Sequence, residues 1–421
     1  MKKMIIRGGK KLSGEVIIGG AKNSTVALIP AAILADTPVH FDSVPDILDV
    51  HNLMKILDQM NVKSEFNEGN LTVDPTMIKD EPLPGGAIKS LRASYYFMGA
   101  LLGRFGRAIV GFPGGDNIGP RPIDQHIKGF KALGAEVIEE DDAVIITSGP
   151  EGLKGARIFM DLVSVGATIN ILLAAVRAKG TTVIENAAKE PEIIDIATFL
   201  NNMGAHIRGA GTGEIRIQGV DSLRAVNTHT IIPDRIEAGT YLSLAAAMGE
   251  GVLVKNVITE HLDSFLAKLS EMGVTFKVNE DSIFVPGGDK IIPIEVTTSP
   301  YPGFATDLQQ PITAVMIKAA GESRIVDTLY PERIKHIPEM QRMGVKIESK
   351  DGVIRINQST ELTGQTVYAD EIRAGAALLE VALMTNGTTV IEKAENILRG
   401  YDCVVKKMTN LSADVEIIDE D

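Results

Sequence analysis

Two hydrophobic patterns alternate along the chain, and each recurs six times. In the first, an apolar helix end is followed by a glycine-containing turn and two short strands that alternate apolar and polar side chains, as half-buried strands do. The six copies occupy residues 54–73, 130–147, 199–217, 266–285, 340–356 and 408–418. The last copy ends after one strand, VEII at 415–418, whereas the chain begins with a lone strand at 3–9. We therefore expect the N-terminal strand to complete the C-terminal domain.

The second pattern precedes each copy of the first. It consists of a short strand, a turn that carries a polar residue, and a helix rich in Ala, Leu, Ile and Gly with few charges. Such a composition is typical of helices that are buried on all sides. A glycine turn and a further strand connect the two patterns, so each repeat reads β-α-β-α-β-β over about 70 residues. The sequence predicts an α/β protein with helices inside and sheets outside.

The length of 421 residues favours two domains, each with three repeats. We place one domain at residues 21–230 and the other at residues 1–20 together with 231–421, so that the chain crosses between them twice. Corresponding turns lie at the same end of each repeat, and we expect them to meet in an interdomain cleft. The loop 111–127 has four glycines and three prolines, a composition that suits an active-site lid and an ordinary surface loop equally well.

Composition narrows the functional classes. A single cysteine, Cys403, excludes an intrachain disulfide and fits a reducing compartment, so we expect a cytoplasmic protein; we interpret Cys403 as a core residue. The net charge of −13 argues against non-specific nucleic-acid binding, and no apolar run reaches the ~18–20 residues of a membrane helix. The seven histidines show no metal-ligand spacing. We expect no metal, no nucleic-acid or membrane partner, and a monomer or weak homo-oligomer.

Polar residues interrupt strand–helix junctions that otherwise suit buried backbone. In chain order, the six turns carry Lys22 and Asn23, Arg92, Ser164, Asp234 and Arg235, Asp307, and Arg373. Charges at such junctions are costly unless they are paired or bind a ligand. Together with Arg121 and Arg399, these turns could hold a small anion with carboxylate and phosphate groups, which arginine forks match. The alternative is that these residues form structural salt bridges between domains. That alternative could explain any single residue, but it explains the whole set less well.

At these residues the chain resembles the UDP-N-acetylglucosamine enolpyruvyl transferases over nearly its full length. The resemblance rests on GAKNS (20–24), LRAS (91–94), PGGDNIGPRPIDQHI (113–127), SVGAT (164–168), ENAAKEPEIID (185–195), PDRIEAGT (233–240), FATDLQ (304–309), IRAG (372–375) and RGY (399–401). It implies the inside-out α/β barrel fold. It also implies transfer of the enolpyruvyl group of phosphoenolpyruvate to the 3-hydroxyl of UDP-N-acetylglucosamine, with release of phosphate and without a cofactor, at the first committed step of peptidoglycan synthesis.

The resemblance also implies roles for individual residues. The residues expected to hold phosphoenolpyruvate are Lys22, Asn23, Arg92, Arg121, Arg373 and Arg399. Those expected to contact UDP-N-acetylglucosamine are Asn23, Arg92, Arg121, Pro122, Ile123, Asp124, Gln125, His126, Ser164, Val165, Gly166, Thr306, Asp307, Asp327 and Thr328. The expected catalytic residues are Lys22, Asp116, Asp307 and Arg399, with Asp307 as the general base for the 3-hydroxyl. Arg333 is expected to close a contact across the domains.

The chain departs from the family pattern at two positions. Most members carry a cysteine where this chain has Asp116, although some carry aspartate. An aspartic acid donates a proton only in its neutral form, so the rate should fall as the pH rises. Because fosfomycin acts by alkylating that cysteine, we expect resistance, and a stoichiometric adduct at Asp116 would refute this. The motif YADEIRAG places Glu371 rather than Asp370 at the family's acidic position, and we expect either carboxylate to be the partner of Arg373.

Two alternative functions remain open from the sequence. A shikimate-3-phosphate enolpyruvyl transferase would share the fold but, by resemblance, not the SVGAT and PDRIEAGT motifs. A non-catalytic paralogue that binds a UDP-sugar and regulates a partner would explain the missing lid cysteine. The presence of Lys22, Asn23, Arg121, Asp307 and Arg399 argues against this paralogue.

Overall fold

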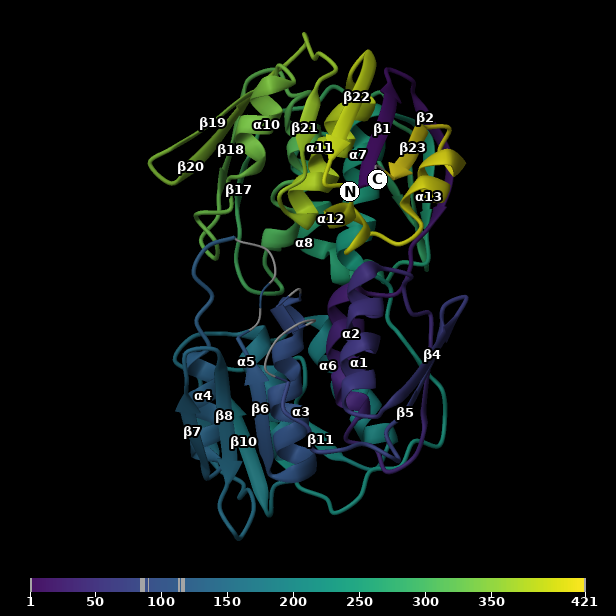
Figure 1. Ribbon diagram of the computed structural model, residues 1–421. Helices are drawn as coiled ribbons and strands as arrows, with labels where there is room; N and C mark the ends of the chain where they lie inside the picture. The colour runs from purple at the N-terminus through teal and green to yellow at the C-terminus, as the bar shows by residue number, and fades with distance from the viewer. Residues whose placement is uncertain (1, 84–87, 90, 113, 115–117, 420–421) are drawn as a thin grey trace. The chain divides into compact units, whose positions relative to one another are not determined.

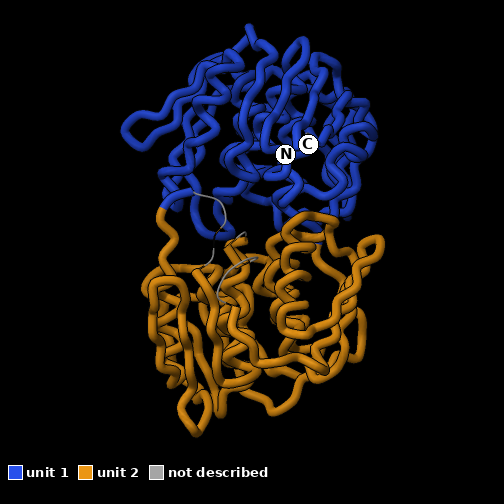
Figure 2. Tube along the Cα trace, viewed as in Figure 1, with its two compact units in different colours: residues 1–19, 116–119, 233–421 blue, residues 20–115, 120–232 orange. Residues whose placement is uncertain are grey.

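The computed structural model describes residues 2–83, 88–89, 91–112, 114 and 118–419, and the chain divides into two compact units (Figure 2). Unit 1 contains residues 1–19, 116–119 and 233–421, and unit 2 contains residues 20–115 and 120–232. Apart from the short stretch 116–119, the chain leaves unit 1 after Gly19 and returns to it after Ile232. Each unit has a hydrophobic core of its own.

The elements of unit 2 follow the predicted alternation of strands and helices (Figure 1). They are α1 (Lys22–Ala32), β3 (Val39–Asp42), α2 (Leu48–Gln59), β4 (Lys63–Asn67), β5 (Asn70–Asp74), the 3₁₀ helix η2 (Arg92–Tyr95), α3 (Tyr96–Phe105), β6 (Arg107–Gly111), α4 (Asp124–Ala132), β7 (Ala135–Glu139), β8 (Ala143–Ser148), β9 (Arg157–Phe159), α5 (Val165–Ala175), β10 (Thr181–Glu185), α6 (Pro191–Asn202), β11 (His206–Arg208), β12 (Glu214–Gln218) and β13 (His229–Thr230). The glycine-rich stretch 209–213 joins β11 to β12 as the turn of an antiparallel hairpin.

Unit 1 begins with two N-terminal strands and continues from residue 233. Its elements are β1 (Lys2–Gly8), β2 (Leu12–Ile17), α7 (Arg235–Met248), β14 (Gly249–Lys255), the 3₁₀ helix η3 (Thr259–Leu262), α8 (Asp263–Glu271), β15 (Lys277–Val278), β16 (Ser282–Val285), β17 (Glu295–Thr297), the 3₁₀ helix η4 (Thr306–Leu308), α9 (Thr313–Met316), β18 (Glu322–Val326), α10 (His336–Arg342), β19 (Lys346–Lys350), β20 (Val353–Asn357), β21 (Thr366–Tyr368), α11 (Ile372–Met384), β22 (Gly387–Glu392), α12 (Glu395–Leu398), α13 (Val404–Asn410) and β23 (Asp414–Asp419).

The sheets repeat one topology. Their strand orders are β13-β3-β5-β4, β6-β8-β7 and β9-β10-β12-β11 in unit 2, and β2-β14-β16-β15, β17-β18-β20-β19 and β21-β22-β1-β23 in unit 1. In the four-stranded sheets the first strand pairs parallel with the second, and the other pairs are antiparallel. The first strand of each four-stranded sheet directly precedes one of the polar turns, and the last two strands of each sheet pair antiparallel.

Three strands, β1, β2 and β13, pair with strands that are distant in the sequence. β1 lies between β22 and β23 and pairs antiparallel with both, with Met4 opposite Ile391 and Ile417. β2 pairs with β14 of unit 1, although it precedes α1 of unit 2. β13 pairs with β3 of unit 2, although it precedes α7 of unit 1. Each of the latter two strands thus stays in the unit that the chain is about to leave.

The helices that follow the polar turns form the centre of each unit (Figure 1). All residues from Ser24 to Ala32 of α1 and from Gly166 to Ala175 of α5 are buried in unit 2. In unit 1 the same holds for Ile236 to Met248 of α7 and for Ile372 to Leu383 of α11. Because these helices are apolar on all sides, they can be covered by other helices and by the inner faces of the sheets. Their first turns, where the polar residues lie, are therefore positioned by rigid elements.

Candidate active site

The first turn of α1 carries Lys22 and Asn23 in unit 2. The Lys22 ammonium lies 3.3 Å from a carboxylate oxygen of Asp49, a fully buried residue of α2. Two residues further on, the Ser24 hydroxyl donates to the buried carboxylate of Asp195, whose other oxygen lies 2.8 Å from Nε2 of His229. These contacts fix the start of α1 from two sides, so Lys22 extends from an immobilised turn.

Arg92 stands at the start of η2 and is supported by groups that we call the Arg92 cluster: Arg92, Tyr95, His126 and Asn170. The guanidinium lies 5.2 Å from the centre of the Tyr95 ring, a cation–π distance, and donates to the main-chain carbonyl of Arg121. The Tyr95 ring in turn meets His126 edge-on at 4.9 Å. Arg92 and the backbone of Arg121 therefore lie next to each other.

The His126 side chain is a neutral hydrogen-bond donor. Burial, followed by the charge of Arg92, lowers the pKa of His126 to about 3. The amide of Asn170 accepts from the backbone of Gly99 and donates to the Tyr95 carbonyl at 3.1 Å and to Nδ1 of His126 at 2.9 Å. Because Nδ1 accepts, the remaining proton of the imidazole is on Nε2. The group thus presents N–H rather than positive charge to its surroundings.

The remaining unit 2 residues occupy two helix starts. Pro122 is exposed, Ile123 is half-buried, and Asp124 begins α4. The amide of Gln125 donates to Asp124 at 2.9 Å and accepts from the backbone of Asp161 at 2.9 Å. Ser164 caps α5, with its hydroxyl oxygen accepting from the Ala167 N–H at 3.2 Å.

Gly166, in the first turn of α5, is required by packing. A Cβ atom at this position would lie 2.2 Å from the Tyr95 hydroxyl and 2.9 Å from the ring. Any side chain would therefore displace the ring that supports Arg92.

In unit 1, four charged residues form what we call the Asp307 cluster: Asp307, Arg333, Glu371 and Arg373. Arg333 donates to Asp307 at 2.8 Å and to Glu371 through Nε at 2.8 Å and through a second, closer contact. Arg373 lies 3.7 Å from the other oxygen of Asp307. The two arginines and Glu371 are buried, whereas the Asp307 side chain keeps 27 % of its exposure. Asp307 is therefore the most exposed member of the cluster.

The charged groups of the Asp307 cluster stabilise one another in their ionised forms. Burial alone would lower the pKa of Arg333, but the carboxylates of Glu371 and Asp307 outweigh this effect and raise it. For Arg373, Tyr401 and Asp307 likewise overcome the effect of burial. The Arg373 guanidinium also stacks over the Tyr401 ring at 5.2 Å, and burial raises the pKa of Tyr401 to about 12. Such pairing is what stabilises ionised groups away from water.

The acidic residue Asp327 organises the turn beside Asp307. One of its oxygens accepts from the hydroxyl of Thr298 and from the backbone of Leu329 and Tyr330. The other accepts from the Thr306 hydroxyl at 2.6 Å. Thr328 is exposed, and its hydroxyl donates to the Thr298 carbonyl. Both oxygens of Asp327 are thus used within the turn, a role that the sequence did not indicate.

Comparisons with known proteins identify the family of the chain. The profile of the EPSP synthase (3-phosphoshikimate 1-carboxyvinyltransferase) family matches residues 6–408. A protein of Lactiplantibacillus plantarum described as UDP-N-acetylglucosamine 1-carboxyvinyltransferase 2 is 67% identical over 99% of this chain and 98% of its own length. The chain belongs to the enolpyruvyl transferase family. The resemblance inferred from the sequence motifs is confirmed.

Other family members support the fold and the narrower relationship. A Lactococcus lactis protein with the same description is 56% identical over the full length of both chains. The enolpyruvyl transferase NikO from Streptomyces tendae superimposes with a TM-score of 0.89 at 25% identity, over 99% of this chain and 98% of that one. EPSP synthase from Acinetobacter baumannii shares the fold with a TM-score of 0.73 at 17% identity, over the full length of both chains. The predicted enolpyruvyl transferase fold is therefore confirmed.

Arg333 is buried among Asp307, Glu371 and Thr306 of its own unit, and its expected contact across the domains stays a prediction. Two other expectations for this family member were wrong. Glu371 pairs with Arg333 and Gln310, and Asp370 pairs with Lys393, whereas Arg373 lies beside Asp307. Cys403 is exposed and precedes α13 in a left-handed conformation, so it is not a core residue. The spacing of charges along a sequence shows which groups need partners but not which partner each one takes.

The positions of other predicted residues do not test the roles that were expected for them. Arg399 ends α12, is half-buried, and donates to Asn396 at a long 3.5 Å. Asp234 caps α7 by accepting from the backbone of Ile236 and Glu237, which is a structural role. Asp116 lies outside the described residues, and the lid hypothesis for it stays a prediction.

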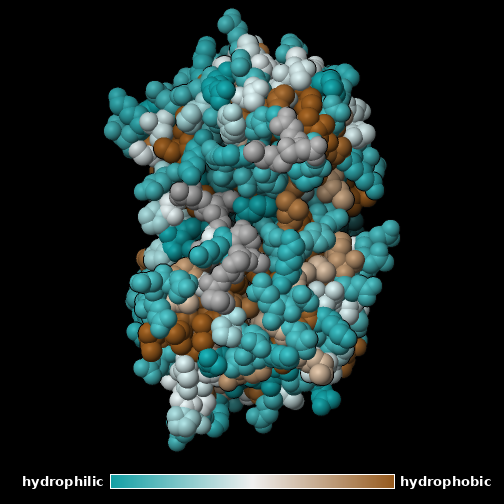
Figure 3. All heavy atoms as spheres, viewed as in Figure 1, coloured by the Kyte–Doolittle hydropathy of each residue, from teal (hydrophilic) through white to brown (hydrophobic). Residues whose placement is uncertain are grey.

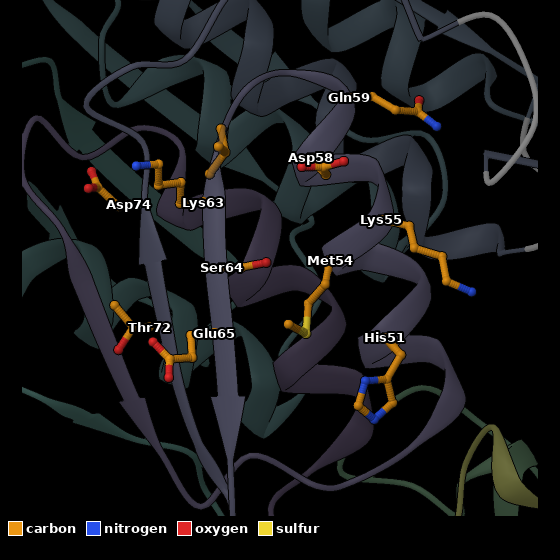
Figure 4. A pocket seen from close by; sticks show the side chains of 11 residues that line it. His51, Met54, Lys55, Asp58, Gln59, Lys63, Ser64, Glu65, Thr72 and Asp74 are labelled. Atoms are coloured by element: carbon orange, nitrogen blue, oxygen red, sulfur yellow. The ribbon is translucent and has the colours of Figure 1, made fainter.

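One surface hollow lies apart from the predicted site residues. An open hollow between α2 and the β4–β5 hairpin contains side chains of both charges, including Lys55, Asp58, Lys63 and Glu65, but none of the predicted site residues (Figure 4). The face shown in Figure 3 is mostly hydrophilic, with small scattered hydrophobic patches. Within the described residues, no helix combines the length and apolar character needed to cross a bilayer.

Proposed function

We propose that the chain transfers the enolpyruvyl group of phosphoenolpyruvate to the 3-hydroxyl of UDP-N-acetylglucosamine and releases phosphate. This is the first committed step of peptidoglycan synthesis. The observation that carries the proposal is the 67% identity, over nearly the full length of both chains, to a relative described as UDP-N-acetylglucosamine 1-carboxyvinyltransferase 2. The partly exposed carboxylate of Asp307 lies between two arginines, and this chemical arrangement also supports the proposal.

The two clusters suit different parts of the substrates. The neutral donors of unit 2, with Ser164 and the segment 121–126, suit the UDP group. The cationic groups suit phosphoenolpyruvate, which carries a phosphate and a carboxylate. Within the described residues, Nη1 of Arg373 is buried and has no hydrogen-bond acceptor. A buried N–H group in this condition is costly, and a carboxylate or phosphate oxygen of the substrate would satisfy it. We infer that the Arg92 cluster contributes to binding of the UDP-sugar and that the Asp307 cluster contributes to binding of phosphoenolpyruvate.

The proposed reaction proceeds by addition and elimination. The ionised Asp307 accepts the proton of the 3-hydroxyl while the hydroxyl oxygen bonds to C2 of phosphoenolpyruvate. C3 gains a proton, for which Asp116 is the proposed donor, and the positive charge that develops at C2 is balanced by the adjacent anionic groups. Loss of a proton from C3 and departure of phosphate then restore the double bond. Lys22, Arg121 and Arg399 would hold the phosphate and carboxylate throughout, as fixed charges that need no reorganisation.

Two further expectations belong to this proposal. We infer that the protein works in the cytoplasm, where both substrates would be available, as a monomer or weak homo-oligomer. With Asp116 in place of the usual cysteine, we expect resistance to fosfomycin. The shikimate-3-phosphate alternative is disfavoured because the EPSP synthase neighbours are 17–18% identical, far below the 67% of the relative described above.

A phosphate-release assay tests the function. The purified chain is incubated with phosphoenolpyruvate and either UDP-N-acetylglucosamine, shikimate-3-phosphate or no acceptor, at pH values from 5 to 8. We expect phosphate release that depends on UDP-N-acetylglucosamine and declines toward high pH. Release that depends on shikimate-3-phosphate would replace the proposal with the first alternative. Binding of the UDP-sugar without release at any pH would favour the non-catalytic paralogue.

A further inference from the structure

A buried ion-pair network lies beside the point where the chain leaves unit 1. Glu237 in the first turn of α7 is 2 % exposed, and Lys407 of α13 is 8 % exposed. The Lys407 ammonium donates to Glu237 at 2.6 Å and to Asp402 at 3.3 Å. The second oxygen of Glu237 accepts from the Gly19 N–H at 2.8 Å. None of these residues was predicted as part of the site.

The network holds Gly19 at both of its backbone groups. Its N–H is bound by Glu237, and its carbonyl accepts from the N–H of Asp234, the residue that caps α7, at 2.9 Å. A Cβ atom at Gly19 would lie 3.0 Å from the Asp402 carboxylate and 3.4 Å from the Lys407 ammonium. The crossing backbone thus packs directly against the ion pair, with no space for a side chain.

The same network fixes the segment that carries Arg399. Asp402 follows Tyr401, whose ring lies under the Arg373 guanidinium, and is three residues beyond Arg399. The Tyr401 hydroxyl forms a 2.9 Å hydrogen bond with Thr240 of α7. Glu237 and Thr240 are three residues apart and therefore lie on one face of α7. This face holds residues 399–402 at two points: through Tyr401, and through Asp402 by way of Lys407.

The electrostatics agree with a pair that stays charged. Burial raises the pKa of Glu237, while Lys407 opposes this effect. Burial alone would lower the pKa of Lys407, but Glu237 and Asp402 outweigh it and raise that pKa. A buried ion pair is weak support for stability in itself, because well-packed apolar residues often do as well. Here the pair instead holds three separate segments together: the backbone at Gly19, the first turn of α7 and residues 399–402.

We propose that Glu237 and Lys407 are positioning residues that set the crossing backbone at Gly19 and the segment 399–402 in register on the first turn of α7. The inference rests on the proposed function, because Arg399 and Arg373 matter as phosphoenolpyruvate ligands. Without the pair, these arginines lose their fixed geometry, whereas the groups of unit 2 that suit UDP are unaffected. A misplaced ligand of this kind weakens binding of one substrate rather than the whole fold.

The test compares Lys407→Met with Lys406→Met, an exposed lysine on the same helix. We expect Lys407→Met to raise the KM for phosphoenolpyruvate about tenfold or more, with the Kd for UDP unchanged within about twofold. Lys407→Arg, which keeps the charge, should restore at least part of the loss, and Lys406→Met should match the parent chain. A phosphoenolpyruvate KM within about twofold of the parent value in Lys407→Met overturns the proposal. So does an equal loss of affinity for both ligands.

A second variant and a second measurement keep the result decisive. If Lys407→Met does not fold, Glu237→Gln/Lys407→Met removes both charges of the pair together, and the same raised KM is expected from it. Hydrogen exchange at Gly19 and at residues 399–403 should become faster in either variant, and unchanged exchange at both segments overturns the proposal. Because exchange needs no turnover, it still tests the pair if the parent chain lacks the transferase activity, in which case the proposed function fails alone.

Discussion

The two units share one repeat, yet they support their candidate site residues by different physical means. In the Asp307 cluster, two buried arginines and a buried glutamate surround one partly exposed carboxylate. In the Arg92 cluster, the groups behind the arginine are a tyrosine ring, a neutral histidine and an asparagine amide. The first cluster depends on matched charges, and the second on packing and neutral hydrogen bonds. Substitutions in the two clusters should therefore fail in different ways.

The difference follows from the proposed chemistry. A general base must sit beside cations that hold it in place and neutralise the charge of an anionic substrate. A site for a nucleotide also needs shape and oriented hydrogen-bond donors, which neutral side chains around Arg92 can supply. The same strand–turn–helix junction supplies both, because the first turn of a buried helix is rigid whatever side chains it carries.

The largest expected effect comes from breaking the charge pairing at Arg333. Arg333→Met leaves Glu371 buried without its guanidinium partner, and removing one member of a buried pair typically costs about 3–5 kcal/mol. Urea unfolding measures the loss. Arg324→Met is the matched control, because Arg324 pairs with Glu322 at the surface and such pairs contribute about 0–1 kcal/mol. A loss below about 1 kcal/mol in Arg333→Met would contradict the view that this cluster depends on charge.

The second-largest effect is expected from removal of the proposed base, Asp307. This effect should fall on turnover rather than on the free energy of unfolding. Asp307→Ala should lower kcat by about 100-fold or more while UDP-N-acetylglucosamine still binds. Steady-state kinetics and calorimetric binding separate the two effects. Asp370→Ala provides the control, since Asp370 is exposed and pairs with Lys393. If Asp307→Ala keeps more than about a tenth of the parent kcat, Asp307 is not the base.

Unit 1 also contains a buried acid, Glu380, that no charge balances among the described residues. It lies in α11, both of its oxygens are buried without a hydrogen-bond partner in that part of the chain, and burial raises its pKa well above the ordinary value. The unfolded chain ionises Glu380 near the usual pKa of 4.5, whereas the folded chain does not. Stability should therefore be greatest below that pH and should fall as the pH rises toward the folded-state pKa.

Glu380→Gln isolates this contribution. Relative to the variant, the parent chain should lose up to ~1.4 kcal/mol per pH unit above the unfolded-state pKa, until the folded carboxyl ionises. Urea unfolding of both proteins at pH 4, 5, 6 and 7 gives the slope of the difference. A constant difference across this range would mean that the carboxyl is already ionised in the folded protein. That result would require a partner for it, and unit 1 would then be fully charge-paired.

The sequence alone predicted the periodic parts of the molecule well. Six repeats, the buried helices at their polar turns and the family follow from apolar periodicity and motifs, because these depend on local composition. The sequence did not predict the partners of the charged residues. Arg333 lies beside Asp307 only because η4 and the segment before α10 meet in the fold, and no spacing rule encodes that meeting.

Some signals were present in the sequence but were not used. Asn170 is a lone amide within the otherwise apolar helix GATINILLAA, which marks a buried polar contact. Tyr401 belongs to the RGY motif, yet its ring contact with Arg373 needs three-dimensional information. Glu380 interrupts an apolar helix in the same manner as Asn170, but within the described part of the chain its oxygens have no hydrogen-bond partner. Composition can thus flag a buried polar group, whereas only the structure distinguishes a satisfied one from an unsatisfied one.

The smallest expected effect concerns the packing of Gly166 against the Tyr95 ring in unit 2. In Gly166→Ala, the added Cβ would meet the Tyr95 hydroxyl at 2.2 Å and must displace the ring. We expect a loss of about 1 kcal/mol in stability, the low end for overpacking, because the contact is with the far end of a side chain. Since Tyr95 supports Arg92, the KM for UDP-N-acetylglucosamine should rise several-fold with little change in kcat. Gly149→Ala, where no atom lies within 4 Å of the new Cβ, should match the parent chain.

A double-mutant cycle then decides whether packing is the cause. Tyr95→Phe removes the hydroxyl that the new Cβ would meet first, so Gly166→Ala should cost less in a Tyr95→Phe background than in the parent chain. If the two substitutions are additive, Gly166 acts on the nucleotide by some route other than the Tyr95 ring. A positive coupling would show that the Arg92 cluster is set by steric fit, in contrast to the charge balance that sets the Asp307 cluster.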